Sequence, residues 1–242
     1  MRIALLSDLH GNEAALDAVL ADVARRGVDR IICLGDVATL GPKPREVLAR
    51  LRDIACACIL GNHDAFMLDP ELIRQYNDAP TIRAAVDWCR SQLNDEDMRQ
   101  IAGFLPSLRL TLGHDMSALL FHGTPRSHME DLLCTTGAEE LDIMLGGQSA
   151  TLMAGGHTHI PMLRRHREIL FVNPGSVGLA FEQHVNGKVP RLLPFAEWAC
   201  VDAASGSISV SLNRVGLERR LLRDAAVSVE HPLGPWLAAQ YA

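Results

Sequence analysis

Five apolar segments of this chain each end in a short polar tip that combines glycine with Asp, Asn or His, and this repetition constrains the fold most. The segments have the composition of buried strands. Unrelated polar turns would not repeat the same arrangement, so we interpret the tips as strand ends. The tips are Asp8-Leu9-His10-Gly11, Gly35-Asp36, Gly61-Asn62-His63-Asp64, His122-Gly123 and Gly155-Gly156-His157-Thr158-His159.

Helical periodicity separates the first three strands. We predict strands over residues 2–7, 30–34 and 54–59, a helix that begins at the N-cap Asn12 and ends at Gly27, and a second helix over 46–51. Alternating strands and helices are typical of a parallel sheet with right-handed crossovers. Such a sheet places the carboxyl ends of its strands along one edge, where α/β proteins bind their ligands. The first three tips are therefore expected to meet.

The rest of the chain is interpreted as part of the same single domain, residues 1–242. Residues 65–104 have helical spacing and are predicted to be a helical insertion. We predict hairpins over 108–121 and 197–215, a helix over 138–144, and strands over 151–154 and 169–172. The basic run 164–167 is interpreted as a solvated hairpin turn, and the tail after Arg223 receives no role. Histidines outside the tips are expected to be exposed or packed: His114, His128, His166, His184 and His231.

Composition narrows the function. The formal net charge is −6, which argues against an extended nucleic-acid-binding surface. No apolar run approaches the ~18 residues that span a bilayer, and the N-terminus lacks the features of a secretory signal. The 6 cysteines are scattered, as in a reduced cytosolic protein. We therefore expect a cytoplasmic protein with no membrane partner.

The polar tips carry groups that bind metals. Carboxylate, amide and imidazole ligands without cysteine suit divalent Mn, Fe, Zn or Ni. The chain has more such groups than one ion needs, and two ions that share Asp36 would use them all. A shared carboxylate holds two ions ~3.5–4 Å apart, the spacing of two-metal hydrolases. Such a centre would carry a small positive charge and attract a phosphate to an otherwise acidic protein.

In their order along the chain and in their residues, the five tips resemble the motifs of the calcineurin-like metallophosphoesterases. The match extends from Ser7 to about Val177 and includes Asn173-Pro174-Gly175-Ser176, which resembles the small prokaryotic phosphodiesterase-type subgroup. The resemblance implies an α/β fold: a four-layer α/β/β/α sandwich of two mixed β-sheets, the metallo-dependent phosphatase fold. The later hairpins are expected to supply the second sheet.

The resemblance also implies two metal sites, with Mn as the favoured ion. The first would use Asp8, His10, Asp36 and His159, and the second would use Asp36, Asn62, His122 and His157. His63 would lie near the leaving-group oxygen, and Asp64 would orient His63.

The activity implied is hydrolysis of phosphodiesters, and of phosphomonoesters as a second substrate class. A hydroxide that bridges the metals would attack phosphorus in line, and His63 would protonate the leaving group. Arg126 and Asn173 are candidate substrate contacts because Arg126 can pair with a phosphate and Asn173 ends a predicted strand. The expected partner is a small phosphoester, with nucleotides among the candidates, and the oligomeric state is not predicted.

Two alternatives stay open. Protein phosphatases and dinucleoside-polyphosphate hydrolases of this kind typically have Gly-Asp-x-x-Asp-Arg-Gly and Gly-Asn-His-Glu, whereas this chain lacks the Asp-Arg pair after Asp36 and ends the later motif at Asp64. The other alternative is a metal-binding scaffold without turnover, as in the retromer subunit that resembles this family. The intact His63 and the complete ligand set favour an enzyme.

Overall fold

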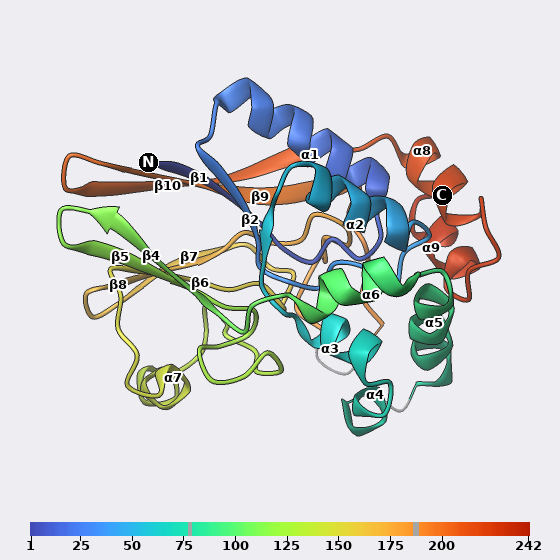
Figure 1. Ribbon diagram of the computed structural model, residues 1–242, viewed down its shortest axis with the longest axis horizontal. Coiled ribbons are helices and arrows are strands. Elements are labelled where there is room, and N and C mark those ends of the chain that lie inside the picture. Colours follow the sequence, from blue (N-terminus) through green and yellow to red (C-terminus); the bar gives the residue numbers. More distant parts are fainter. Residues whose placement is uncertain (77–78, 186–188) are drawn as a thin grey trace.

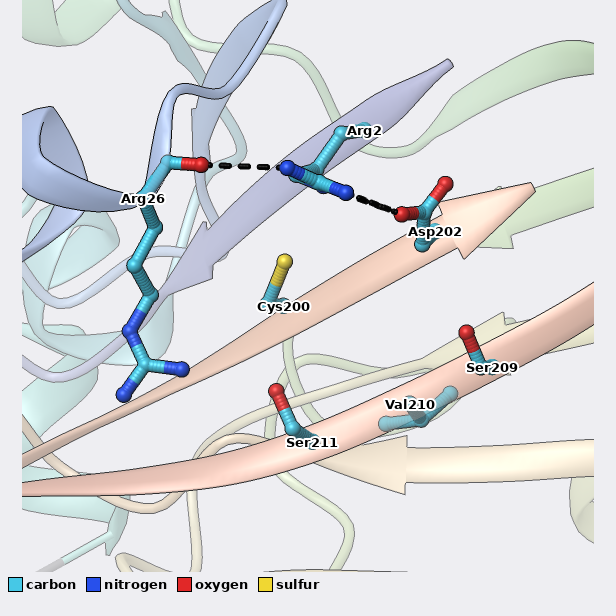
Figure 2. A pocket seen from close by; sticks show the side chains of 7 residues that line it. All are labelled: Arg2, Arg26, Cys200, Asp202, Ser209, Val210 and Ser211. Carbon is cyan, nitrogen blue, oxygen red and sulfur yellow. Dashed lines mark hydrogen bonds and ion pairs between the residues drawn. The ribbon is translucent and has the colours of Figure 1, made fainter. Parts of the chain in front are cut away.

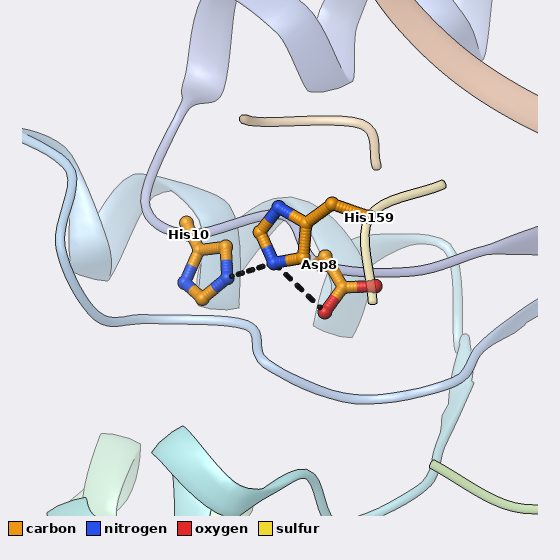
Figure 3. A group of neighbouring side chains, drawn as sticks. All are labelled: Asp8, His10 and His159. Carbon is orange, nitrogen blue, oxygen red and sulfur yellow. Dashed lines mark hydrogen bonds and ion pairs between the residues drawn. The ribbon is translucent and has the colours of Figure 1, made fainter. Parts of the chain in front are cut away.

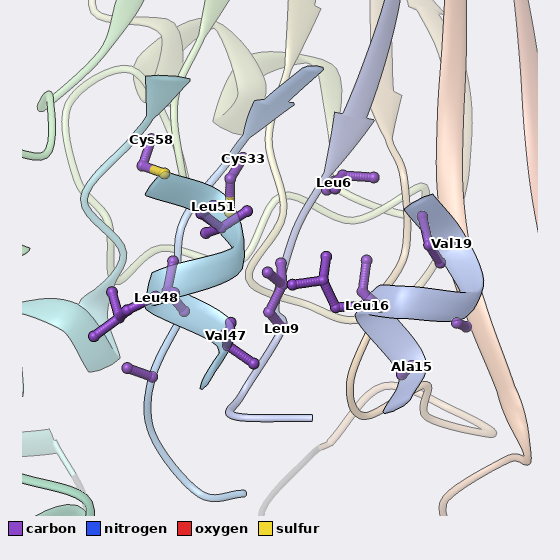
Figure 4. Packing of buried hydrophobic residues seen from close by; sticks show 14 of the residues in the cluster. Leu6, Leu9, Ala15, Leu16, Val19, Cys33, Val47, Leu48, Leu51 and Cys58 are labelled. Carbon is purple, nitrogen blue, oxygen red and sulfur yellow. The ribbon is translucent and has the colours of Figure 1, made fainter. Parts of the chain in front are cut away.

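Strand β1 (Arg2–Leu6) is apolar on both faces and must therefore be covered on both. Ala4 and Leu6 pack in one core cluster with the inward faces of helices α1 (Glu13–Arg26) and α2 (Pro44–Asp53). Ile3 and Leu5 pack in a second cluster together with residues of another sheet. Figure 4 shows Leu6 with the buried side chains of α1 and α2 around it. The alternation of side chains along β1 thus fixes a helix layer on one side and a sheet on the other.

The computed structural model describes residues 1–76, 79–185 and 189–242, which form two mixed five-stranded sheets (Figure 1). The first sheet has the order β10 (Ser207–Gly216), β9 (Phe195–Ala204), β1, β2 (Arg30–Cys33), β3 (Ala57–Cys58). The second has the order β4 (Leu108–Gly113), β5 (Met116–Leu120), β6 (Leu152–Ala154), β8 (Ile169–Asn173), β7 (Met162–His166). Strands β1, β2 and β3 run parallel, as do β5, β6 and β8, and the outer pairs are antiparallel.

The outer face of the second sheet is covered by helix α7 (Ala138–Leu145). Phe121 and Phe171 from the sheet segments pack with Leu141 and Leu145 of this helix in a third core cluster. In Figure 1, α7 lies below the second sheet, and α1 and α2 lie beyond the first. The predicted four-layer α/β/β/α sandwich is therefore confirmed.

The predicted ends of the first helix are confirmed. The Asn12 side chain accepts a hydrogen bond from the Ala15 amide at 3.1 Å, and Gly27 ends the helix at a φ of 64°. That left-handed conformation is strained for residues with a Cβ, so glycine suits the position.

We had expected the later hairpins to supply the second sheet. For the last hairpin this prediction is wrong, because it belongs to the first sheet. The hairpin over 108–121 forms β4 and β5 of the second sheet, but β9 pairs antiparallel with β1, with Ile3 opposite Val201. The second sheet is completed by β7, which spans Met162–His166 and so includes most of the run 164–167 that we had interpreted as a turn. Its burial alternates from Met162 to His166, so Arg164 and Arg165 lie on an edge strand, where charged residues discourage pairing with another chain.

The third strand is shorter than predicted. Only Ala57 and Cys58 pair with β2, because α2 continues to Asp53 and a turn must follow it. Within that turn Ala55 adopts a φ of 49°, and Ile54 is 38% exposed.

The predicted insertion and the C-terminal tail are both helical. The predicted insertion contains α3 (Asn62–Leu68), α4 (Leu72–Tyr76), α5 (Pro80–Ser91) and α6 (Asp95–Ala102). The tail contributes α8 (Arg219–Ala226) and α9 (Gly234–Gln240), whose Leu222 and Leu237 pack against Ala85 of α5 and against Leu179. The tail therefore has a structural role that its weak sequence pattern did not indicate. Among the described residues, no helix has the length and apolar character needed to cross a membrane.

His231, between α8 and α9, makes the tail sensitive to acid. Its Nδ1 accepts a hydrogen bond from the Leu233 amide at 3.1 Å, and its ring lies against Trp88 of α5. Burial lowers the pKa of His231 from 6.5 to about 4. The folded state therefore resists a proton that the unfolded chain accepts, and stability is lost as the pH falls from 6.5 towards 4.

We predict that His231→Asn removes this part of the acid sensitivity. Asparagine keeps an acceptor near the Leu233 amide but does not titrate. Between pH 6.5 and 4 the native protein should lose about 3 kcal/mol more unfolding free energy than the variant. Urea unfolding across this pH range measures the difference, and parallel curves for the two proteins would contradict it.

Candidate metal centre

The strand-end tips hold five of the predicted ligands in an unusual backbone conformation. Asp8, His10, Asp36, His157 and His159 have φ values of 54°, 45°, 57°, 67° and 58°. Non-glycine residues rarely adopt this left-handed region, and each instance costs of the order of 1 kcal/mol or more. The surrounding sheet edges must therefore hold these side chains in place, and strain of this kind clusters at functional sites.

The first ligand group contains Asp8, His10 and His159 (Figure 3). The Nε2 atoms of His10 and His159 lie 3.1 Å apart, and His159 Nε2 lies 3.4 Å from Asp8 Oδ1. All three side chains are buried. The group joins the first tip, 8–10, which follows β1 of the first sheet, to the last tip, 157–159, which follows β6 of the second sheet.

The second ligand group contains Asp36, His122 and His157, with Asn62 beside it. Asn62 Oδ1 lies 3.0 Å from His122 Nε2 and 2.8 Å from His157 Nδ1. Asp36 Oδ1 lies 3.5 Å from His122 Nε2. These residues are also buried. The fifth tip contributes one histidine to each group, His159 to the first and His157 to the second.

Asp36 connects the two groups. Its Oδ2 lies 3.8 Å from His10 Nε2 of the first group, while its Oδ1 faces His122 of the second. The structure thus brings together all seven residues that the sequence predicted as ligands, with Asp36 between the two sets.

The protonation pattern of the rings fits cations. His122 Nδ1 donates to the Leu34 carbonyl at 2.8 Å, and His159 Nδ1 donates to the Leu179 carbonyl at 2.6 Å. In a neutral imidazole the other nitrogen then carries a lone pair. These Nε2 lone pairs point at further acceptors, among them Asp8 Oδ1, which is buried without a hydrogen-bond partner among the described residues. Acceptors that face acceptors in a buried site need a proton or a metal cation between them.

The pKa values of three ligand histidines indicate which rings are neutral and which one carries a proton in the metal-free site. Burial lowers the pKa of His157 to about 3 and holds that of His10 well below its usual range. Burial acts on His122 in the same direction, but Asp36 outweighs it and raises the His122 pKa to about 9. In the metal-free site a proton on His122 therefore offsets part of the negative charge, and a bound cation would displace it.

Two glycines allow the tips to approach each other. Gly61 has an ordinary φ of −87°, so its backbone conformation does not require glycine. A Cβ on Gly61 would instead overlap Asp36 Oδ1. Gly35 has a φ of 112°, and a Cβ there would lie 2.7 Å from His122 Nδ1. Glycine is needed at both positions because the second ligand group is built against the backbone.

Asp64 does not orient His63, and that prediction is wrong. Its carboxylate accepts hydrogen bonds from the backbone amides of Asp36, Val37 and Gly61 at 2.8, 2.9 and 3.0 Å. Asp64 therefore ties the Asp36 tip to the first turn of α3. It holds the backbone of Asp36, the ligand shared by both groups, and its hydrogen bonds do not involve the His63 ring.

His63 lies beside the first ligand group. Its ring centroid is 5.1 Å from that of His10, and its backbone amide donates to Asp36 Oδ1 at 2.8 Å. Among the described residues, Nδ1 of His63 has no hydrogen-bond partner. Burial lowers the pKa of His63 to about 4, so the ring is neutral near pH 7. A neutral imidazole beside the first ligand group is suited to act on a substrate bound there.

The two predicted substrate contacts are used elsewhere. The Asn173 side-chain amide donates to the Gly156 carbonyl at 2.7 Å and accepts from the Gly175 amide at 2.9 Å, so it braces the last tip, and its role as a substrate contact is unsupported. Arg126 is exposed and pairs with Glu130 through its Nε and Nη2 atoms, which leaves that prediction unsupported.

Several residues of the site carried no sequence signal. Thr39 Oγ1 lies 3.3 Å from His10 Nδ1, and Asp131 Oδ1 lies 3.3 Å from His157 Nε2. The carbonyls of Leu34 and Leu179 hold two further rings. A backbone carbonyl is present at every position, and only the fold reveals which ones face a histidine.

A cavity of about 360 Å³ lies elsewhere, near the start of β1 (Figure 2). Its Arg2 pairs with Asp202 at 2.6 Å and donates to the Arg26 carbonyl at 3.1 Å, so the charge of Arg2 is already balanced. This cavity contains none of the predicted ligands.

Comparison with known proteins identifies the family. Residues 1–189 match the calcineurin-like phosphoesterase superfamily domain. An uncharacterized protein of Methanocaldococcus jannaschii, MJ0912, is 31% identical over 73% of this chain and 70% of its own length. The phosphodiesterase YfcE of Escherichia coli is 28% identical over 74% of this chain and 80% of its own.

A solved structure agrees with these sequence matches. The metallophosphoesterase from Sphaerobacter thermophilus superposes with a TM-score of 0.74 at 25% identity, over 99% of this chain and 100% of that chain. The sequence matches and the structural match therefore indicate the same family for the chain that carries the two ligand groups. The chain belongs to the calcineurin-like phosphoesterase superfamily, a family of metal-dependent phosphoester hydrolases.

Proposed function

We propose that the protein is a dinuclear metal-dependent phosphoesterase that prefers phosphodiesters and also accepts phosphomonoesters. The observation that carries this proposal is the position of Asp36, whose two carboxylate oxygens face different ligand groups. One metal would be held by Asp8, His10, Asp36 and His159, and the other by Asp36, Asn62, His122 and His157. The preference for diesters is supported by the phosphodiesterase name of the Escherichia coli relative.

Two divalent ions would supply Lewis acidity and a water of lowered pKa. We favour manganese, because carboxylate, amide and imidazole ligands without thiolate suit it. We also propose that the protein acts in the cytoplasm. The chain itself contributes rings of fixed tautomer, since His122 and His159 are held by backbone carbonyls at Nδ1. Fixed ligands need no reorganisation when charge develops during the reaction, which lowers the barrier.

His63 is the proposed contact for the phosphoryl group or the leaving oxygen. Its ring is neutral in the substrate-free site because burial lowers its pKa to about 4. An anionic phosphate beside the ring would raise that pKa and favour the protonated form. His63 would then donate a proton to the departing oxygen.

A direct test combines metal analysis with hydrolysis. The purified protein should contain about two divalent ions per chain and hydrolyse bis-p-nitrophenyl phosphate faster than p-nitrophenyl phosphate. Removal of the ions with a chelator should abolish both reactions, and Mn²⁺ should restore them. Two bound ions with no hydrolysis of either ester would favour the scaffold alternative.

Replacing Asp36 should cost the metals themselves. Asp36→Asn removes the negative charge that both groups share, so metal affinity should fall by more than about 100-fold. Elemental analysis after dialysis against a metal buffer measures the loss. Asp142→Asn is the matched control, because Asp142 pairs with His166 and Arg167 on the opposite outer layer. A variant at position 36 that retains both ions would contradict the shared-ligand proposal.

Replacing His63 should affect turnover and spare the metals. His63→Ala and His63→Gln should lower kcat by about 10²–10⁴-fold, the contribution typical of a positioned acid. Both variants should bind the same number of ions as the native protein, since His63 belongs to neither ligand group. Steady-state kinetics with elemental analysis tests this, and unchanged kcat would remove His63 from the mechanism.

A further inference from the structure

The loop after His122 folds back tightly and carries Asp131 to the second ligand group. The Thr124 amide donates to the Ser127 carbonyl at 2.7 Å, and the Thr124 hydroxyl donates to Glu130 Oε2 at 2.7 Å. Arg126 pairs with the same glutamate. Residues 124–130 are thus tied together, and they place the next residue, Asp131, at a defined position.

Asp131 lies between two histidines from other parts of the chain. Its Oδ1 is 3.3 Å from His157 Nε2, and its Oδ2 is 3.2 Å from His184 Nε2. His157 is a predicted ligand on the last tip, whereas His184 follows β8 and is partly exposed. The carboxylate therefore connects a ligand of the second group to the surface of the site.

His157 faces the centre with a different ring nitrogen from that used by His122 and His159. His122 and His159 turn Nε2 to the centre and use Nδ1 to bond a backbone carbonyl. His157 turns Nδ1 to Asn62 Oδ1, at 2.8 Å, and its Nε2 faces Asp131. A neutral imidazole has one N–H and one lone pair, so whichever group accepts the N–H decides which nitrogen can bind a metal.

We propose that Asp131 is a positioning residue that accepts the Nε2 proton of His157 and thereby presents the Nδ1 lone pair to the second metal. His184 holds the other oxygen of Asp131 and keeps the carboxylate in register. Asp131 contacts the nitrogen of His157 that points away from the metal, so it affects the metal only by way of the imidazole ring. The inference rests on the proposed function, because it assumes that the second ligand group binds a metal.

The chemistry of the contact agrees with this role. A carboxylate that accepts the second N–H of a metal-binding histidine fixes the ring orientation and makes the ligand more basic, and loss of such a partner typically costs 10–100-fold in metal affinity. In this place His122 and His159 have backbone carbonyls as partners, and His10 has the Thr39 hydroxyl. Asp131 is the charged counterpart among them and should strengthen its ligand more.

The test is a metal titration of the full-length protein. Native protein, Asp131→Ala, Asp131→Asn and His184→Ala are stripped of metal and titrated with Mn²⁺ in a metal buffer, and the dissociation constants of both ions are measured. Asp131→Ala should weaken the binding of one of the two ions by about 10–100-fold and leave that of the other within a factor of about 3. Asp131→Asn keeps an acceptor oxygen and should recover part of the affinity, and His184→Ala should weaken the same ion by less.

Asp142→Ala is the matched control, because Asp142 also accepts from a histidine, His166, at 2.7 Å, but that histidine is not a ligand. It should leave both constants unchanged. Equal affinities in Asp131→Ala and the native protein, or an equal loss at both ions, would overturn the inference. If Asp131→Ala does not fold, the Asn and His184 variants provide the same comparison. Failure of the native protein to bind a second ion would instead contradict the dinuclear proposal itself.

Discussion

The structure depends on one carboxylate, that of Asp36, being held between two sets of acceptors. Asp64 fixes the Asp36 backbone amide, the His63 amide binds Asp36 Oδ1, and Gly61 leaves the space that this oxygen occupies. From this position Asp36 faces His10 on one side and His122 on the other. A buried assembly of lone pairs is unfavourable unless protons or cations offset it, so the arrangement is suited to bind cations.

The rest of the fold supplies the rigidity that such a site needs. Five ligands have left-handed backbone conformations, which persist only where the surroundings over-determine them. Hydrogen bonds between tips provide that support, for instance from the Asp8 amide to the Gly35 carbonyl and from the Gly156 amide to the His122 carbonyl, at 2.9 and 2.7 Å. The cost of local strain is offset by the two sheets and their apolar layers.

A second layer of contacts sets how each ring presents itself. Leu179 illustrates the link to distant parts of the chain: its carbonyl holds His159, while its side chain packs in the cluster formed by α8 and α9. The C-terminal helices thus stabilise a ligand that lies far from them in sequence. Thr39 has a comparable position beside His10, and Asp131 beside His157.

The sequence by itself determined the strand-end tips and the ligand types, because periodicity and residue identity are local properties, whereas the four-layer class followed from the resemblance of the motifs to a known family. All seven predicted ligands converge as the motifs indicated. Only the tertiary structure decided that β9 pairs with β1, that Asp64 binds backbone amides, and that Asn173 braces a tip. Those outcomes depend on which groups meet across long separations, and a carboxylate or amide has many possible partners until the packing of the sheets leaves one within reach.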